Sequence, residues 1–248
     1  MAREGNSAER LLVLIPAFNE ERDLGGLIAR VRGVAPSAEI LVVDDCSRDR
    51  TGEIARGAGA RVARHPVNLG YGAALLTGYR YADREGFGRV VQLDGDGQHE
   101  PESILPLLSP LDDGFDLVLG SRFRSGARRY RAPWLRAVGM RFFGGIASQA
   151  LGQRISDPTS GFQALSRRLV LFHSRGNHFP QDYPDADILI LVGRRGFRIT
   201  EVPVTMYEKP TGSSIHSGLR PIYYVIKMTL SILLALSEKR RAIDEEVP

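Results

Sequence analysis

The sequence predicts an α/β domain whose mostly parallel central sheet is flanked by helices. In the first half of the chain, short apolar runs typical of strands alternate with segments whose apolar residues recur at helical spacing. The connections between them are short, and alternation of this kind requires crossovers that make strands parallel. No repeat, low-complexity block or long linker divides the 248 residues, which suffice for one large domain.

The first half is predicted to contain five strands and four helices. The strands are short and rich in Val, Ile and Leu: Leu11–Ile15, Ile40–Val43, Arg61–Arg64, Arg89–Leu93 and Asp116–Leu119. The helices between them span Glu20–Val34, Thr51–Ala58, Gly72–Glu85 and Pro101–Leu111. Asp49 or Thr51 suits the start of the second helix, and Pro101 suits a first helical turn.

The second half is less regular. We expect helices over Pro133–Leu151, Arg167–Ser174 and Asp185–Gly193, a strand over Phe197–Val204, a Gly- and Ser-rich loop over Lys209–Gly218, and a helix from about Leu219 to Lys239. We therefore divide the chain into a polar tail (1–9), one main domain (10–215) and a C-terminal amphipathic helix with a polar tail (216–248).

The composition is that of a soluble globular protein, with 43% apolar and 25% charged residues and a net charge of +4. Cys46 is the single cysteine, which fits a reducing compartment, and neither a signal peptide nor a run of roughly 20 apolar residues is present. We therefore expect a cytoplasmic protein that does not bind nucleic acid. Seven arginines and no acid lie between Arg122 and Arg141, either as a solvated face or as a site for anionic head groups or phosphates.

The most informative motif is Asp94-Gly95-Asp96-Gly97-Gln98, which directly follows an apolar strand. Residues i and i+2 of a strand share a face, so the two carboxylates can reach one hard cation, with the Gln98 oxygen at the same stride. The glycines allow close approach of a ligand. A turn is the alternative, and an EF-hand fails because the sixth and twelfth positions are His99 and Leu105. The motif favours a magnesium or manganese site in an enzyme that uses nucleotides.

Polar residues also follow two other strands. Pro16-Ala17-Phe18-Asn19-Glu20 ends the first strand, and Asp44-Asp45 ends the second. Each could be a helix cap or a turn. Ligands of parallel sheets bind at the carboxyl ends of the strands, so we expect all three motifs to line one cleft. Carboxylates there suit hydrogen bonds to a base and a ribose, with a cation bridging the phosphates.

A glycine-rich segment, Asn68-Leu69-Gly70-Tyr71-Gly72, precedes the third helix. It lacks the third glycine of the dinucleotide-binding fingerprint and follows the third strand instead of the first. We therefore interpret it as a helix start that packs near a bound nucleotide.

These motifs, together with Val43–Thr51, Gly120-Ser121-Arg122 and Asp157-Pro158-Thr159-Ser160-Gly161-Phe162, occur in an order that resembles the family 2 inverting glycosyltransferases of GT-A fold. The last two point to the branch of dolichyl-phosphate mannosyltransferase and its bacterial polyprenyl-phosphate relatives. The resemblance covers roughly residues 10–215. It implies a metal-dependent transfer of a mannose- or glucose-type hexose from a GDP- or UDP-sugar to a polyprenyl phosphate, with inversion.

The resemblance also implies roles for individual residues. Those at the donor would be Pro16, Ala17, Asn19, Glu20, Asp44, Asp45, Gly70, Asp94, Gly95, Asp96 and Lys209. Asp94, Asp96 and Gln98 would hold Mg²⁺ or Mn²⁺ against the diphosphate. Arg122, Arg136 and Ser160 would face the acceptor phosphate, because arginine offers a fixed fork of donors. Asp157 would lie near the reacting centre, which makes Asp94, Asp96, Asp157 and Arg122 the catalytic set.

The acceptor decides whether a base is needed. A polyprenyl phosphate is already anionic near neutral pH, since the second pKa of a phosphomonoester is about 6, and can attack directly. A hydroxyl acceptor on a glycan or protein would need a general base, for which Asp157, Asp182, Asp185 and Asp187 are the carboxylates to test. A catalytically silent nucleotide-sugar binder is the third hypothesis.

The C-terminal helix bears on where the protein works. Its apolar stripe could cover the protein's own core or rest on an anionic membrane surface. The resemblance therefore implies a peripheral protein at the cytoplasmic face of the membrane, held by the lipid surface or by a membrane partner protein.

Overall fold

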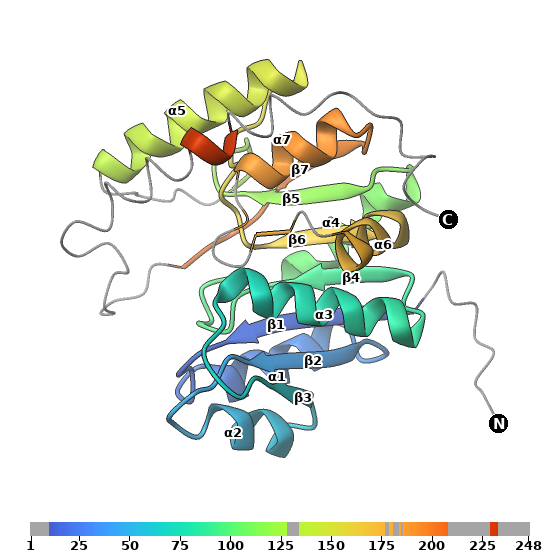
Figure 1. Ribbon diagram of the computed structural model, residues 1–248. Helices are drawn as coiled ribbons and strands as arrows, with labels where there is room; N and C mark the ends of the chain where they lie inside the picture. Colours follow the sequence, from blue (N-terminus) through green and yellow to red (C-terminus); the bar gives the residue numbers. More distant parts are fainter. Residues whose placement is uncertain are drawn as a thin grey trace.

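A seven-stranded sheet runs through the middle of the part of the chain that the structure describes (Figure 1). The computed structural model describes residues 10–127, 134–176, 179–180, 184, 186–207 and 229–232, and for residues 134–141 the backbone alone. The strands are β1 (Leu11–Ala17), β2 (Glu39–Asp44), β3 (Arg61–Arg64), β4 (Arg89–Gln92), β5 (Leu117–Ser121), β6 (Gln163–Ser166) and β7 (Ile199–Pro203). Their order is β3-β2-β1-β4-β6-β5-β7. The pairs are parallel except that β6 runs antiparallel to β4 and β5, which confirms the predicted mostly parallel α/β fold.

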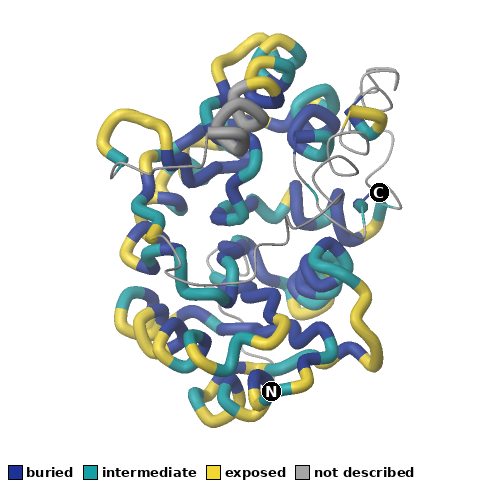
Figure 2. Tube along the Cα trace, turned by 90° about the vertical axis from the view of Figure 1, so that its left-hand side faces the viewer, coloured by how far each residue is buried: buried dark blue, intermediate teal, exposed yellow. Residues whose placement is uncertain are grey.

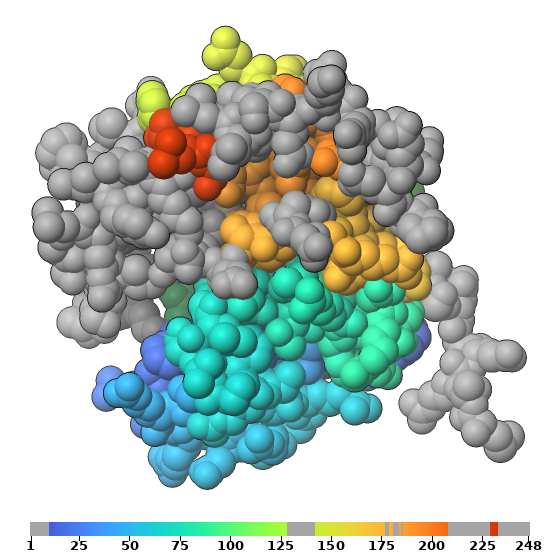
Figure 3. All heavy atoms as spheres, viewed as in Figure 1, coloured from blue at the N-terminus to red at the C-terminus, as the bar shows by residue number. Residues whose placement is uncertain are grey.

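Helices cover both faces of this sheet. They are α1 (Leu24–Val34), α2 (Thr51–Gly57), α3 (Tyr71–Glu85), α4 (Ile104–Asp112, after a 3₁₀ turn at Pro101–Ser103), α5 (Trp134–Leu151), α6 (Arg167–Arg175) and α7 (Ala186–Arg194). One core contains buried residues of α3, α5, α6 and α7, and the other contains residues of α1, α2 and α4. Figure 3 shows the first face, where α3 and α6 lie side by side.

The pattern along β1 shows why both faces are covered. Leu12 and Leu14 belong to the core under α3, whereas Val13 and Ile15 belong to the core under α1. Successive side chains of a strand point to opposite faces, and all four of these are fully buried. Figure 2 shows the strands as a buried middle layer, with exposed residues on the outer loops and helix faces. A parallel sheet of this kind needs helices on both sides.

Two local expectations were wrong. The strand β6 was not predicted, because Gln163-Ala164-Leu165-Ser166 carries too short an apolar run to stand out. It becomes a strand by pairing with β4 on one side and β5 on the other. The first helix begins at Leu24 instead of Glu20, because Asn19 has a left-handed backbone with φ of 58° and the Glu20 N–H donates to Thr51 Oγ1.

The C-terminal helix was predicted from about Leu219 to Lys239, and only residues 229–232 of it are described. These four are helical. Ile232 is buried in the core under α5 and α7, whereas Leu230 is exposed. For these residues the helix therefore packs on the protein's own core. The predicted loop at Lys209–Gly218 lies outside the described residues. None of the helices in the described ranges is both long and apolar enough to cross a membrane.

Candidate active site

The three polar strand ends meet at one edge of the sheet, as predicted. β2, β1 and β4 are neighbours, and the first two are joined beyond their ends by a hydrogen bond from Asp45 N–H to the Ala17 carbonyl (2.9 Å). Gly95 brings the third motif against the first. A Cβ on Gly95 would lie 3.1 Å from the Pro16 oxygen and 3.3 Å from the Ala17 methyl. The missing side chain therefore lets the two segments approach.

Asn19 holds the loops after β1 and β2 together. Its Oδ1 accepts the Arg48 N–H (2.8 Å), and its own N–H donates to Ser47 Oγ (3.0 Å). Its left-handed backbone is a conformation that asparagine adopts more readily than most residues. Asn19 and Glu20 thus lie at the strand end where the donor was predicted to bind, although the two hydrogen bonds of Asn19 serve the fold.

Asp49 secures the same loop pair and is held ionised. Burial raises its pKa, but the hydrogen bonds that it accepts from Thr51 and from the Glu21 N–H outweigh burial and lower the pKa below its usual value. A carboxylate that accepts backbone N–H groups at a helix start is stabilised in its charged form. This fixes the entrance to α2, directly beside Asn19.

Asp44 and Asp45 turn inward. The Asp44 carboxylate is fully buried; Oδ1 accepts the Ser47 N–H (2.8 Å) and Oδ2 lies 3.6 Å from Arg64 Nε. Asp45 is 4% exposed, and its two oxygens accept the N–H groups of Leu69 (2.8 Å) and Gly70 (2.9 Å). These carboxylates organise the loops at the ends of β2 and β3. Their contact with a base and ribose stays a prediction.

His65 is a residue at this edge that the sequence did not reveal. Its Nδ1 lies 2.7 Å from Asp45 Oδ1, and its Nε2 lies 2.9 Å from Thr77 Oγ1 on α3. A lone histidine after a strand carries no signal in the sequence. In the structure it links the Asp45 carboxylate to α3, so that Gly70 and the helix start have a fixed place.

The Asp94-Gly95-Asp96 motif follows β4 at the same edge of the sheet. The Asp94 N–H donates to Nδ1 of the buried His99 (3.2 Å), and its Oδ1 accepts the Tyr71 hydroxyl (2.8 Å). Its side chain is 30% exposed. Asp96 Oδ1 accepts the Gln98 N–H (3.0 Å), which closes the turn at Gly97, where φ is +73°.

This donor set fits a divalent cation that also takes ligands from a substrate. Within the described ranges, no group of three or more His, Cys, Asp or Glu residues converges as a complete metal site. Two half-exposed carboxylates and the Gln98 amide leave coordination positions for phosphate oxygens, which is how Mg²⁺ and Mn²⁺ are commonly held. Gly161 leaves space there, since a Cβ at that position would lie 2.8 Å from Asp94 Oδ2.

Beyond the end of β5, Arg122 forms a buried ion pair with Asp157. Arg122 Nε and Nη2 each lie 2.6 Å from an Asp157 oxygen, and the Arg122 N–H donates to Oδ2 (3.0 Å). Arg122 is 5% exposed and Asp157 fully buried. The Nη1 of Arg122 lies 3.6 Å from Met206 Sδ. Asp157 is therefore placed to orient Arg122.

Glu201 on β7, which the sequence did not point to, anchors the loop that contains Asp157. This loop connects α5 with β6 (residues 152–162) and is called the Asp157 loop below. Its carboxylate accepts the N–H groups of Ser156 and Asp157 (both 2.9 Å) and the Ser156 hydroxyl (2.7 Å). Ser160 ties the same loop to β5 by donating to the Gly120 carbonyl (2.6 Å). The predicted contact of Ser160 with an acceptor phosphate stays a prediction.

Two predicted residues are not placed beside these groups. Arg136 belongs to α5, where the backbone alone is described, and Lys209 lies outside the described residues. Both residues were assigned roles from the family resemblance, and these roles stay predictions.

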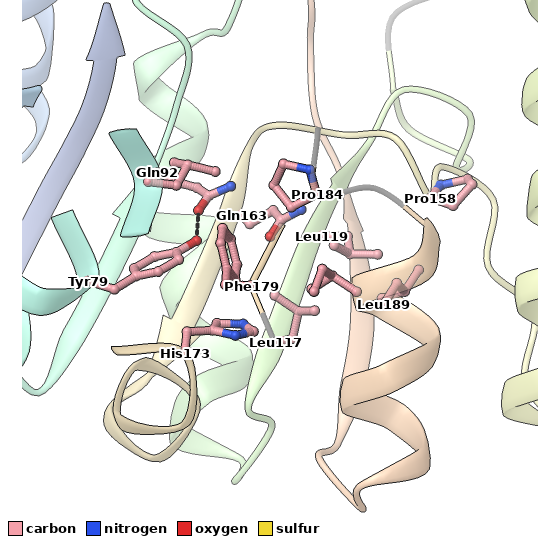
Figure 4. A pocket seen from close by; sticks show the side chains of 12 residues that line it. Tyr79, Gln92, Leu117, Leu119, Pro158, Gln163, His173, Phe179, Pro184 and Leu189 are labelled. Atoms are coloured by element: carbon pink, nitrogen blue, oxygen red, sulfur yellow. Dashed lines mark hydrogen bonds between the residues drawn. The ribbon is translucent and has the colours of Figure 1, made fainter. Parts of the chain in front are cut away.

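A small internal cavity lies under the loop at Pro158, on the face of α3, α6 and α7 (Figure 4). Its volume is about 20 Å³, enough for about one water molecule. Tyr79, Gln92, Gln163 and His173 add polar groups to an otherwise apolar wall, and Asp94 and Asp96 do not line it. The cavity is therefore not part of the predicted cation site.

Comparison with known proteins agrees with this geometry. The model of glycosyl transferase family 2 matches residues 12–172. The polyprenol monophosphomannose synthase of Mycolicibacterium smegmatis is 34% identical over 85% of this chain and 82% of its own length. The undecaprenyl-phosphate mannosyltransferase of Micrococcus luteus is 32% identical over 84% of this chain and 88% of its own length.

A solved structure shares the fold. Glucosyl-3-phosphoglycerate synthase from Mycobacterium tuberculosis, in complex with Mn²⁺, UDP-glucose and phosphoglyceric acid, superposes with a TM-score of 0.67 at 21% identity, covering 91% of this chain and 79% of that one. The predicted GT-A fold is thus confirmed. The family model and the two relatives agree with the strand-end motifs and the sheet topology, and they show that the chain belongs to glycosyl transferase family 2.

Proposed function

We propose that the protein transfers a hexose, with inversion, from a nucleoside-diphosphate sugar to a polyprenyl phosphate. The observation that carries this proposal is the meeting of two half-sites at one sheet edge. Asp94 and Asp96 lie on one side, and the Arg122–Asp157 pair lies on the other, joined through Gly161 of the Asp157 loop. The names of the two relatives above, a polyprenol monophosphomannose synthase and an undecaprenyl-phosphate mannosyltransferase, support the choice of acceptor.

The donor half would be assembled by residues at the ends of β1, β2 and β4. Pro16, Asn19, Glu20 and Asp44 would line the base and ribose, and Asp94, Asp96 and Gln98 would hold a divalent cation. When bound, the cation would neutralise charge on the departing diphosphate. Asp49 and Asp45 accept backbone N–H groups of these loops and keep them in place before substrate arrives, so little ordering is needed on binding.

The transfer itself needs no strong base. A phosphate oxygen of the acceptor would form a bond to the anomeric carbon, and the bond from that carbon to the diphosphate oxygen would break, with its electron pair leaving on the nucleoside diphosphate. The acceptor is already an anion at neutral pH, since its second pKa is about 6. The protein's contribution is to align two anions and screen their repulsion.

Arg122 would place positive charge near the acceptor phosphate, although its side chain is 4% exposed and its Nε and Nη2 are engaged by Asp157. Further positive charge would come from Arg136 and Lys209. For a hydroxyl acceptor, Asp157 is poorly placed to accept a proton, because it is fully buried with both oxygens engaged by Arg122. Asp182 and Asp185, two of the other carboxylates named for that alternative, lie outside the described residues. The acceptor lipid would bring the protein to the cytoplasmic face of a membrane.

The test is transfer of labelled sugar into lipid. The full chain is incubated with UDP-glucose or GDP-mannose, Mg²⁺ or Mn²⁺, and undecaprenyl or dolichyl phosphate, and the organic phase is counted. We expect label in the organic phase with one donor, its loss on chelation with EDTA and its return with fresh metal. Donor binding in calorimetry without label in lipid for any donor would contradict the proposal and favour a silent binder.

A further inference from the structure

The carboxylate of Asp94 is oriented by a residue from another element. Tyr71 is the first residue of α3, and its hydroxyl donates to Asp94 Oδ1 at 2.8 Å. The two residues are 23 positions apart in the sequence. Tyr71 lies between Gly70 and Gly72 of the glycine-rich segment and is not among the residues assigned to the donor, the cation or the acceptor.

Asp94 is held from two directions. Its N–H donates to Nδ1 of His99, which is 2% exposed and whose ring centroid lies 5.1 Å from that of Phe162. With its peptide pinned on this side and Oδ1 held by Tyr71 on the other, the carboxylate keeps one orientation. In this orientation Oδ2 lies 3.8 Å from His99 Nδ1 and faces the space at Gly161.

Tyr71 is itself well placed. The residue before it, Gly70, donates its N–H to Asp45 Oδ2 (2.9 Å) and begins α3 with a φ of 98°, which a glycine adopts without strain. Asp45 is in turn fixed by His65, which contacts Thr77 one and a half turns further along α3. The start of the helix, and with it the tyrosine, is thus tied to the end of β2.

Gly161 provides the space for the pair. A Cβ at this position would lie 2.8 Å from Asp94 Oδ2, 3.0 Å from Oδ1 and 3.0 Å from the Tyr71 hydroxyl. Any side chain at 161 would displace one of the two partners. Three segments far apart in the chain therefore converge on one carboxylate: the start of α3, the end of β4 and the loop before β6.

We propose that Tyr71 is a positioning residue that orients the Asp94 carboxylate for the divalent cation, in a space that Gly161 leaves open. The inference rests on the proposed function, in which Asp94 is a ligand of the cation. Hydrogen-bond partners of metal ligands fix the ligand's orientation, and their loss commonly weakens metal binding by about 10- to 100-fold.

The test compares Tyr71→Phe with the unchanged protein. Free Mn²⁺ is measured by electron paramagnetic resonance during titration, with UDP and separately with GDP present. We expect the Kd for Mn²⁺ to rise about tenfold in Tyr71→Phe, while the melting temperature falls by no more than about 4 °C, the effect of one hydrogen bond in a domain of this size.

Tyr81→Phe is the matched control. Tyr81 lies on the same helix and also donates to a carboxylate, that of Glu39, at the opposite end of β2. Its loss removes the same kind of hydrogen bond away from the site and should leave the Kd for Mn²⁺ unchanged. Asp94→Ala should abolish binding of the metal.

The outcomes separate the two proposals. If Asp94→Ala abolishes Mn²⁺ binding and Tyr71→Phe binds Mn²⁺ as the unchanged protein does, the role of Tyr71 is refuted and the proposed function stands. If Asp94→Ala leaves Mn²⁺ binding unchanged, Asp94 is not a ligand, and both the metal site and the role of Tyr71 are refuted.

Discussion

Arg122 and Asp157 are joined by two parallel hydrogen bonds of 2.6 Å in a place where neither side chain is more than 4% exposed. Arg122 follows β5, and Asp157 lies 35 residues later in the loop before β6. The antiparallel pairing of β5 with β6 brings them together. Because the pair is buried, replacing one member leaves the charge of the other unpaired inside the protein, so the two must be replaced together to measure the pair's effect on stability.

Asp157→Ala is expected to lower the free energy of unfolding by about 3–5 kcal/mol, because it leaves the Arg122 charge buried without its partner. The double variant Arg122→Met/Asp157→Leu removes both charges and should recover more than half of that loss. Urea unfolding followed by circular dichroism measures both values. If the double variant loses the sum of the losses measured for Arg122→Met and Asp157→Leu alone, the pair is not coupled. An activity assay on Arg122→Ala alone would confound unfolding with loss of acceptor binding.

Glu201→Ala is expected to destabilise the protein by about 1.5–3 kcal/mol, because the backbone N–H groups of Ser156 and Asp157 would lose a charged acceptor inside the protein. The control is Glu100→Gln, which alters an exposed hydrogen bond with Tyr207 and should change stability by less than about 0.5 kcal/mol. Chemical denaturation compares them. Equal, small effects would show that Glu201 does not hold the Asp157 loop.

The convergence of the three strand ends could be predicted from the sequence. The runs before Asn19 and Asp44 are continuous and apolar, the run before Asp94 is apolar except for Gln92, and parallel strands bring their carboxyl ends to one edge. The place of Asp94 just beyond the end of β4 follows from this pattern. The expectation that Asp94 and Asp96 share a strand face was wrong, because β4 ends at Gln92 and Gly95 and Asp96 lie in a turn. The orientation of the carboxylates could not be predicted. Asp44 and Asp45 were expected to face a base and a ribose, but they accept backbone N–H groups of neighbouring loops.

The partners of these residues could not be predicted, because they depend on which strands are neighbours. The strand β6 has four residues and little apolar signal, yet it separates β4 from β5 and sets the place of the Asp157 loop. Tyr71, His65 and Glu201 look like ordinary helix, loop and strand residues until the topology is known. Their roles arise from contacts across at least 12 positions of the chain.

The link between α3 and α6 is expected to weaken in acid. Burial raises the pKa of Asp83, but hydrogen bonds from Arg175 and Ser174 outweigh it, so the pKa lies below its usual value. A carboxylate with a lowered pKa in the folded state stabilises the protein above its unfolded pKa of about 3.9, and this contribution is lost as the pH falls through the folded pKa.

Asp83→Asn should therefore lower stability by at most about 1 kcal/mol at pH 7, since Arg175 is largely exposed. The difference from the unchanged protein should shrink as the pH falls below about 4. Urea titrations at several pH values, in a double-mutant cycle with Arg175→Met, measure the coupling. A coupling energy that does not change with pH would exclude the ionised carboxylate as its source.

Gly161→Ala is expected to impair the cation site without unfolding the protein. The backbone of Gly161 does not have a positive φ, so alanine is allowed there, but its methyl group would lie 2.8 Å from Asp94 Oδ2 and 3.0 Å from the Tyr71 hydroxyl. The carboxylate must shift, and the Kd for Mn²⁺ should rise by about tenfold or more. Gly26→Ala on α1, where a Cβ meets nothing within 4 Å, is the control; it should raise stability by about 0.4–1 kcal/mol and leave Mn²⁺ binding unchanged. Unaltered metal affinity in Gly161→Ala would mean that the Asp157 loop yields instead of Asp94, and that the cation site does not depend on the space at Gly161.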